Sequence, residues 1–105
     1  MRLILGTIAL AISASLIAVA PSADAATLRQ WNRVAGCESG GRWYINTHNG
    51  YYGGLQISDP TWRAYGGRVY SFHASGTGKY HQIRIAQRIL RGQGRGAWGY
   101  CGRFL

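Results

Sequence analysis

The chain is 105 residues long and carries twelve Lys and Arg against three Asp and Glu, which gives a net charge of +9 near pH 7. This length holds one small domain and excludes a second, and so strong a positive charge indicates attraction to a polyanion. The two cysteines and three histidines lack the spacing of metal ligands, so we expect neither a metal ion nor a cofactor.

Residues 1–25 have the features of an export signal. Arg2 precedes an apolar run, Leu3–Ala20, and the small-residue triplet ADA ends at Ala25. The run is nearly long enough to span a bilayer, so a retained anchor is the alternative, but hydroxyl residues dilute it and the cleavage pattern follows directly. We predict cleavage after Ala25, secretion, and a mature domain of residues 26–105.

The mature chain begins with a predicted amphipathic helix that runs from Leu28 to the pair Gly40-Gly41, with Thr27 as a favoured N-cap. One stripe of this helix recurs at intervals of three and four and includes the only glutamate of the chain: Leu28, Trp31, Ala35 and Glu38. The pattern therefore places Glu38 in the last turn of a helix.

Residues 43–58, WYINTHNGYYGGLQIS, mix aromatic and β-branched residues with Asn-Gly and Gly-Gly breaks, and predict a short irregular hairpin or Ω-like loop. Glycine on both sides of Tyr51-Tyr52 favours a loop tip there. The following DPTWRAYGG predicts one short helix, with Asp59 as N-cap, Pro60 at the first helical position and Gly66-Gly67 as the stop.

The remaining residues divide into a loop, a helix and a tail. Residues 68–79 are polar and contain glycine, so we expect a loop, and residues 80–92 form the clearest amphipathic pattern. Its predicted inward face has three members with a fourth beside them: Ile83, Ala86 and Leu90, then Ile89. With a glycine-rich tail over residues 93–105, the fold class is α+β, predominantly α, with a small hairpin.

Cys37 and Cys101 are the only cysteines. Export places them in an oxidising compartment, where they allow a single intrachain pairing. Closing a loop of about 65 residues stabilises a domain by roughly 4 kcal/mol in the chain-entropy model. We expect this disulfide, with free thiols or a bond between two chains as the alternatives.

Glu38 is the strongest catalytic candidate, against the alternative of an ordinary exposed residue. The last turn of a helix presents the negative end of the dipole, and a partly apolar cleft also disfavours the carboxylate, so both raise the pKa of Glu38. Arg33 or Arg42, if close, would oppose this. A glutamate protonated near neutral pH can act as general acid on a glycosidic oxygen.

Glycoside cleavage ordinarily uses two carboxylates, and Asp59 is the only other one in the mature domain. Its place before Pro60 explains it as a helix cap. If Asp59 is structural, Glu38 must serve as acid and base, and the substrate itself must trap the reactive carbon. A sugar with an N-acetyl group and a free 6-hydroxyl allows this, and peptidoglycan carries both.

Other signals are weaker. The four Trp and seven Tyr suit sugar rings but also a hydrophobic core. No motif places a histidine beside Ser39, as a nucleophilic serine requires. The segment RGQGRG follows a helix, whereas a phosphate-binding loop precedes one.

The ordered motifs between Trp31 and Cys101 are W-x-x-V-A-x-C-E-S-G-G-x-W-x-I-N-T-x-N-G-Y-Y-G-G-L-Q, then T-W-x-A-Y-G-G, then Q-I-x-I-A-x-x-I-L-x-G-Q-G-x-G-A-W-x-x-C. Together they resemble the catalytic domain of the actinobacterial resuscitation-promoting factors. The resemblance implies a secreted, lysozyme-like domain, related to soluble lytic transglycosylases, with one disulfide and a cleft for peptidoglycan glycan. It implies Glu38 as the catalytic acid. Residues assigned to the cleft are Gln56, Thr61 and Gln93, with Tyr51 and Trp62 as aromatic faces.

We therefore predict a secreted, monomeric, wall-associated enzyme that cleaves the β-1,4 bond between N-acetylmuramic acid and N-acetylglucosamine, as a lytic transglycosylase or muramidase with a role in growth resuscitation. Its expected partners are glycan strands, anionic wall polymers and a wall endopeptidase, without nucleic acid or membrane insertion. The first alternative is a non-catalytic cationic wall-binding or antimicrobial protein. A second, an extracellular nucleic-acid binder, rests on charge alone.

Overall fold

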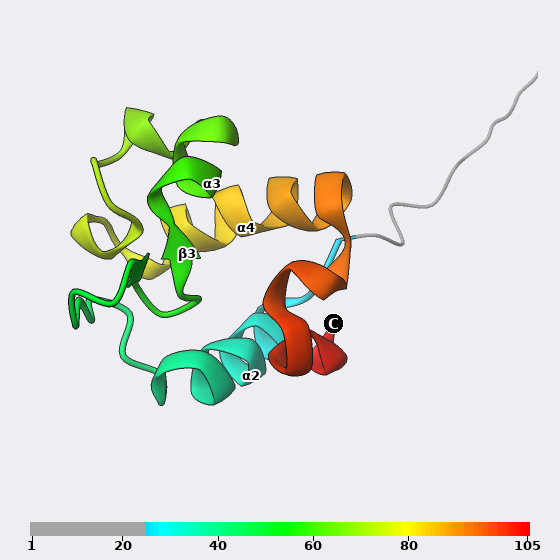
Figure 1. The fold of residues 1–105 in the computed structure, drawn as a ribbon. Helices are drawn as coiled ribbons and strands as arrows, with labels where there is room; N and C mark the ends of the chain where they lie inside the picture. The colour runs from blue at the N-terminus through cyan, green and yellow to red at the C-terminus, as the bar shows by residue number, and fades with distance from the viewer. Residues whose placement is uncertain (1–24) are drawn as a thin grey trace, which may run out of the picture.

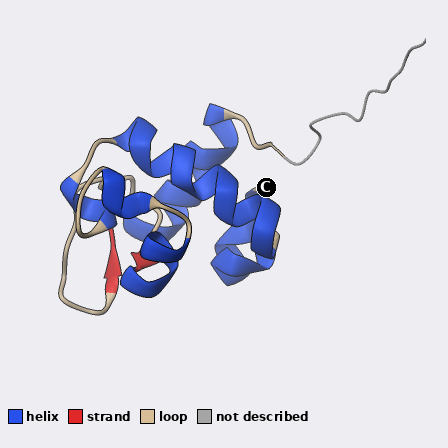
Figure 2. Cartoon of the chain, turned by 90° about the horizontal axis from the view of Figure 1, so that it is seen from above, coloured by secondary structure: helices blue, strands red, loops and turns tan. Residues whose placement is uncertain are grey.

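The computed structural model describes residues 25–105, so the predicted export signal lies outside the described residues apart from Ala25 (Figure 1). The elements in chain order are α2 (Leu28–Ser39), β2 (Tyr51–Tyr52), β3 (Ile57–Ser58), α3 (Asp59–Ala64), the 3₁₀ helices η1 (Gly67–Val69) and η2 (Ala74–Gly76), α4 (Lys79–Gln93), and the 3₁₀ helix η3 (Arg95–Phe104). Figure 2 shows one small sheet toward one side of a mostly helical domain. The predicted α+β, predominantly α, fold class is confirmed.

Helix α2 begins and ends where the sequence predicts. The Thr27 hydroxyl accepts the N–H of Gln30 (3.1 Å), and the Gln30 side chain accepts the N–H of Thr27 (2.7 Å), which completes a capping box. At the other end Gly40 adopts a left-handed conformation, with φ +67°. This conformation favours glycine and stops the helix after Ser39.

The predicted hairpin is present, but its tip lies elsewhere. Strands β2 and β3 pair antiparallel, with Tyr51 opposite Ser58 and Tyr52 opposite Ile57. The prediction of a tip at Tyr51-Tyr52 is therefore wrong, because the chain turns over residues 53–56. Gly54 in this turn lies against Trp43, and a Cβ added at Gly54 would lie only 2.5 Å from the indole ring.

Helix α3 has the predicted place and a different cap. The side-chain oxygen of Ser58 accepts the N–H of Thr61, so Ser58 is the N-cap and the prediction of Asp59 in that role is wrong. Ser58 retains the extended backbone of β3 and can reach forward to the first turn. Asp59 is already helical, and its Oδ1 lies 2.8 Å from Nδ1 of His73.

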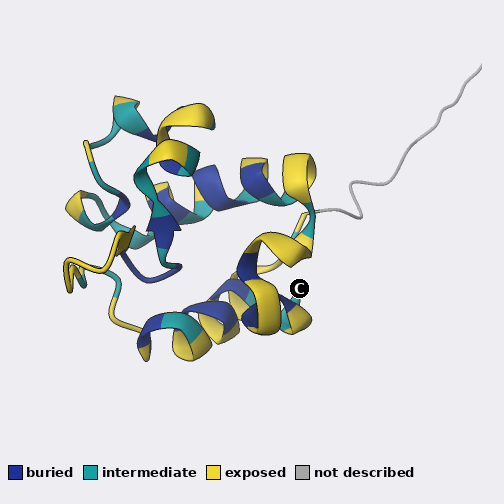
Figure 3. Ribbon diagram, in the orientation of Figure 1, coloured by how far each residue is buried: buried dark blue, intermediate teal, exposed yellow. Residues whose placement is uncertain are grey.

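Helix α4 matches the predicted span to within a residue, but the prediction of its inward face is wrong. Figure 3 shows buried and exposed residues along α4. The buried residues are Gln82, Ile85, Ala86 and Ile89, whereas Ile83 and Leu90 are only half-buried. The polar Gln82 enters the core because backbone groups satisfy its amide. Its Nε2 donates to the carbonyls of Trp43 (2.7 Å) and Thr77 (2.8 Å), and its Oε1 accepts the N–H of Gly54 (3.0 Å).

The segments expected to be irregular contain short helices. The predicted loop of residues 68–79 holds single turns of 3₁₀ helix, and the tail forms η3, which is interrupted at Gly99. Runs of 3₁₀ helix are usually short, which agrees with the interruption. Segment η3 packs against α2 and α4.

The disulfide between Cys37 and Cys101 is confirmed and joins α2 to η3. The disulfide lies beside the hydrophobic core, whose buried residues come from the helices and the hairpin: Trp31, Val34, Ala35, Leu55, Ile57, Trp62, Ala74, Ile85, Ala86, Ile89 and Trp98. Among the residues that the structure describes, no helix has the length and apolar character needed to cross a membrane.

Candidate active site

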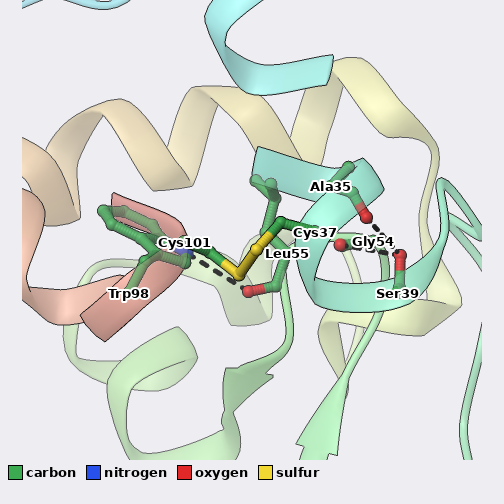
Figure 4. Close-up of a disulfide and its surroundings, with 7 residues drawn as sticks. All are labelled: Ala35, Cys37, Ser39, Gly54, Leu55, Trp98 and Cys101. Atoms are coloured by element: carbon green, nitrogen blue, oxygen red, sulfur yellow. Dashed lines mark hydrogen bonds between the residues drawn. A yellow bond between two sulfur atoms is a disulfide. The ribbon is translucent and has the colours of Figure 1, made fainter. Parts of the chain in front are cut away.

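The last turn of α2 is held on two sides of Glu38. Cys37 is bonded to Cys101, with the two Cα atoms 5.7 Å apart. The buried Ser39 hydroxyl contacts the carbonyl oxygen of Gly54 at 2.9 Å (Figure 4). Because the residues on both sides are anchored, the backbone of Glu38 has little freedom to move.

The Glu38 carboxyl is half-buried, and this burial raises its pKa above the ordinary value. The one ion pair within residues 25–105 joins His73 and Asp59, so neither arginine considered above pairs with Glu38. Arg42 instead donates from Nε to the carbonyl oxygen of Ser39 at 2.7 Å. The predicted direction of the pKa shift is confirmed, with burial as its cause.

A groove of about 60 Å³ lies where the hairpin, the start of α3, the end of α4 and η3 meet. It is lined by Tyr51, Gln56, Ile57, Ser58, Thr61, Ile89, Gln93, Ala97 and Trp98. Four of the five residues predicted to bind substrate are in this lining, namely Tyr51, Gln56, Thr61 and Gln93. The fold thus brings together side chains from two segments that are far apart in the sequence, residues 51–61 and residues 89–98.

One hydrogen bond joins the turn that carries Glu38 to the hairpin turn beside the groove, and a second joins that hairpin turn to η3. Ser39 contacts the carbonyl of Gly54, and Nε1 of Trp98 donates to the carbonyl of Leu55 at 3.2 Å (Figure 4). The next residue, Gln56, lines the groove. Glu38 itself is not part of the lining; it lies on the helix end to which the groove wall is attached.

The polar groups of the groove are held in defined positions. Gln56 has φ +51°, which is unfavourable for a residue other than glycine and is typical of functional or constrained sites. Its Nε2 donates to the carbonyl of Gly53 (3.0 Å), and its Oε1 accepts from Asn49 (3.4 Å). The Thr61 hydroxyl accepts from Ser58 (3.1 Å), so its own proton remains available for a ligand.

Asp59 does not share this groove. It lines a separate hollow of about 420 Å³ beside α3, together with Pro60, Arg63, Ala64 and Arg68. Its carboxylate oxygen is 2.8 Å from Nδ1 of His73. Although this hollow is larger, it brings together none of the predicted substrate-binding side chains.

The sequence matches a family of known domains. A family model described as a transglycosylase-like domain matches residues 25–101, which include Glu38, the groove and both cysteines. The chain belongs to this family. The resemblance expected from the motifs is therefore confirmed.

Several relatives of this transglycosylase-like domain are named resuscitation-promoting factors. Rpf1 of Corynebacterium glutamicum is 49% identical over 104 residues, which cover 99% of this chain and 53% of that protein. RpfA of Mycobacterium tuberculosis is 52% identical over 85% of this chain and 22% of its own length. Rpf of Micrococcus luteus is 44% identical over 88% of this chain and 40% of its own length. The chain spans about half, or less, of the length of these relatives.

The structure corrects the prediction for Trp62. Its side chain is 0% exposed, and its Nε1 donates to the carbonyl of Ser71 at 2.9 Å. The ring packs on Gly67, where an added Cβ would lie 2.1 Å from the indole. Trp62 is therefore a core residue of the transglycosylase-like domain and presents no face to a sugar.

Trp98 is the groove aromatic that sequence reasoning did not select. It is 7% exposed, and its ring meets Trp31 edge to face with centroids 5.0 Å apart. One sequence signal pointed to Trp98: it precedes Cys101 by three residues, and the disulfide at Cys101 fixes the position of this segment. The apolar wall formed by Ile57 and Ile89 had no such signal.

The described part of the domain contains no group of three or more His, Cys, Asp or Glu side chains able to hold a metal ion. Glu38 supplies a carboxyl on the attached helix end, and the groove supplies amide, hydroxyl and aromatic groups.

Proposed function

We propose that this domain is an exported enzyme that cleaves the β-1,4 bond between N-acetylmuramic acid and N-acetylglucosamine in peptidoglycan. One observation carries the proposal: Glu38, whose pKa is raised by burial, lies on a turn joined to a groove of amide, hydroxyl and aromatic groups. Membership of the transglycosylase-like family supports it. The names of the relatives support an added role in growth resuscitation.

In the first step, Glu38 acts as general acid. The bond between the anomeric carbon and the bridging oxygen breaks, its electron pair goes to that oxygen, and the oxygen takes the proton of Glu38. A raised pKa keeps this proton on the carboxyl at a higher pH than an exposed glutamate allows. The step leaves a glutamate anion and an electron-poor anomeric carbon.

In the second step, the substrate supplies the nucleophile. Asp59 lies in another hollow and contacts His73, which supports a mechanism with one working carboxylate. The 6-hydroxyl of the muramyl sugar attacks the anomeric carbon, and the Glu38 carboxylate takes the proton of that hydroxyl. The product is an anhydro sugar, and the carboxyl is protonated again. Attack by water would instead give a reducing end, as in a muramidase.

The groove suits part of a sugar. Its volume is about 60 Å³, and its lining combines amide and hydroxyl groups with apolar side chains, which suits the polar and methyl parts of an acetamido group. We assign Gln56, Thr61 and Gln93 to hydrogen bonds with the N-acetyl group and adjoining sugar atoms. The exposed ring of Tyr51 would contact the face of the sugar.

The proposal includes the setting of the enzyme. Residues 1–25 act as the export signal, and residues 26–105 form a monomeric, wall-associated catalytic domain. The mature domain carries eleven Lys and Arg against two acidic residues, which favours anionic wall polymers as additional partners. A wall endopeptidase acting on the peptide cross-links would complement glycan cleavage.

The decisive variant is Glu38→Gln, which keeps the shape of the side chain and removes the transferable proton. We expect cell-wall solubilisation to fall by about 10²- to 10⁴-fold, the usual contribution of a general acid. Circular dichroism and thermal unfolding should show an intact fold. Activity equal to that of the parent would exclude this role and favour a non-catalytic wall-binding protein.

Mass spectrometry of the released muropeptides tests the second step. We expect fragments ending in anhydro-muramic acid, which are lighter by one water than fragments with a reducing end. Reducing ends alone would retain Glu38 as the acid but replace the 6-hydroxyl by water.

A further inference from the structure

The outer face of α4 carries a row of exposed basic side chains. We call the row the α4 basic stripe, and it consists of His81, Arg84, Arg88 and Arg91, all exposed. Their spacing of three, four and three residues places them on one side of the helix, along about 15 Å at 1.5 Å per residue. The buried face of α4 lies on the other side (Figure 3).

No acidic side chain is available to neutralise this stripe from within residues 25–105. The only Asp and Glu there are Glu38 and Asp59. Glu38 belongs to the last turn of α2, and Asp59 contacts His73. The field of the stripe therefore extends into solvent and attracts anions.

Two members of the stripe are already fixed by the fold. Arg88 donates from Nη1 to the carbonyl oxygen of Tyr65 at 3.0 Å. The ring of His81 stacks on Tyr70, with centroids 4.0 Å apart, and its Nδ1 is 2.7 Å from the hydroxyl of Thr77. Fixed side chains lose less conformational freedom when a ligand binds.

The chemistry of the stripe indicates its ligand. A guanidinium group matches phosphate oxygens with two parallel hydrogen bonds, and a row of such groups matches a linear chain of phosphates. Helices that lie in a lipid surface bury an apolar face in it, but the apolar face of α4 is already in the protein core. These observations favour a linear polymer over a membrane.

We propose that the α4 basic stripe binds a linear phosphodiester polyanion of the cell surface. Ile89 and Gln93 of α4 line the groove, and the helical spacing places them on the side away from the stripe. Polymer and glycan strand can therefore be held together, with the polymer retaining the domain on the wall. This inference rests on the proposed function and deepens it, because it gives the anionic wall polymer a chemical class and a binding surface; its test does not use catalysis.

The test compares two pairs of arginines with synthetic poly(glycerol phosphate) as the probe, measured by fluorescence anisotropy at low salt. Arg84→Gln with Arg91→Gln removes two charges from the stripe. Arg29→Gln with Arg33→Gln removes two charges from exposed positions on α2. Neither pair includes Arg88, whose contact with Tyr65 could matter for folding. Thermal unfolding confirms that both variants are folded.

We expect the stripe variant to bind about tenfold more weakly than the parent and the control variant to stay within about twofold, with the difference shrinking as salt is added. Equal weakening in both variants would overturn the proposal, because net charge alone would then explain binding. So would a stripe-dependent affinity for phosphatidylglycerol vesicles without affinity for the polymer. Glu38→Gln should bind the polymer like the parent, so failure of the catalytic proposal would leave this result unchanged.

Discussion

The last turn of α2 and the first turn of α3 each present one carboxylate, and their surroundings differ. Glu38 lies at the negative end of a helix, half-buried and outside the one ion pair of the described residues, and burial raises its pKa. Asp59 lies in the first turn of a helix and contacts His73. The same chemical group is placed to hold a proton in one turn and to anchor a loop in the other.

The largest expected effect separates the two carboxylates by activity. Asp59→Asn should keep wall-solubilising activity within about threefold of the parent, because its side chain lies outside the groove. Glu38→Gln should lose the 10²- to 10⁴-fold expected for a general acid. The rate at which labelled fragments are released from purified walls measures the activity of both variants, compared at equal concentrations of folded protein. An equally severe loss in Asp59→Asn would show that catalysis needs both carboxylates.

The next effect concerns the anchor beside Glu38. Replacing Cys37 and Cys101 by serine removes a cross-link between positions 64 residues apart, which should lower the free energy of unfolding by about 4 kcal/mol. Urea unfolding gives this value, and reduction of the parent should reproduce it. A loss below about 1 kcal/mol would mean that packing of η3 on α2 suffices without the bond.

The smallest expected effect is on stability, where the variants Glu38→Gln and Asp59→Asn should differ in sign. The pKa of Glu38 is raised in the folded state, so the folded protein favours the protonated carboxyl. This contribution to the free energy of unfolding is complete below the unfolded pKa and is lost as the pH rises through the folded pKa. At pH 7, Glu38→Gln should therefore match or exceed the parent in stability, by less than about 1 kcal/mol for a partly exposed group. Near pH 3 the two should coincide.

At pH 7, Asp59→Asn should instead lower the free energy of unfolding by about 0.2–1 kcal/mol, because it weakens the contact with His73. Chemical unfolding at the two pH values measures both variants. A stability loss at pH 7 in Glu38→Gln as large as that in Asp59→Asn would remove the contrast between the two turns.

Local signals predicted the elements well. The capping box at Thr27 and the left-handed Gly40 bound α2 as expected, because both act through neighbouring backbone groups. The inward face of α4 was mispredicted because periodicity counts apolar side chains. Gln82 is buried through contacts with backbone up to 39 residues away, and no local pattern contains that information.

The residues of the candidate site also differ in how well the sequence could predict them. Glu38 could be singled out because it is the only glutamate and because a helix end and two glycines follow it. Trp62 and Trp98 could not be told apart, because an indole suits both a core and a sugar face, and the spacing of Trp98 to Cys101 indicates only that its segment is fixed. Only packing decides that Trp62 enters the core on Gly67 and that Trp98 reaches the groove.

By itself the sequence determined helices α2, α3 and α4, the single possible pairing of Cys37 with Cys101, and the scarcity of carboxylates that leaves Glu38 as the candidate acid. These follow from hydrogen bonding within a few residues and from composition. The tertiary structure decided that Gln56, Thr61 and Gln93 share one groove, and that burial raises the pKa of Glu38. Both require segments distant in the chain to pack together and exclude water.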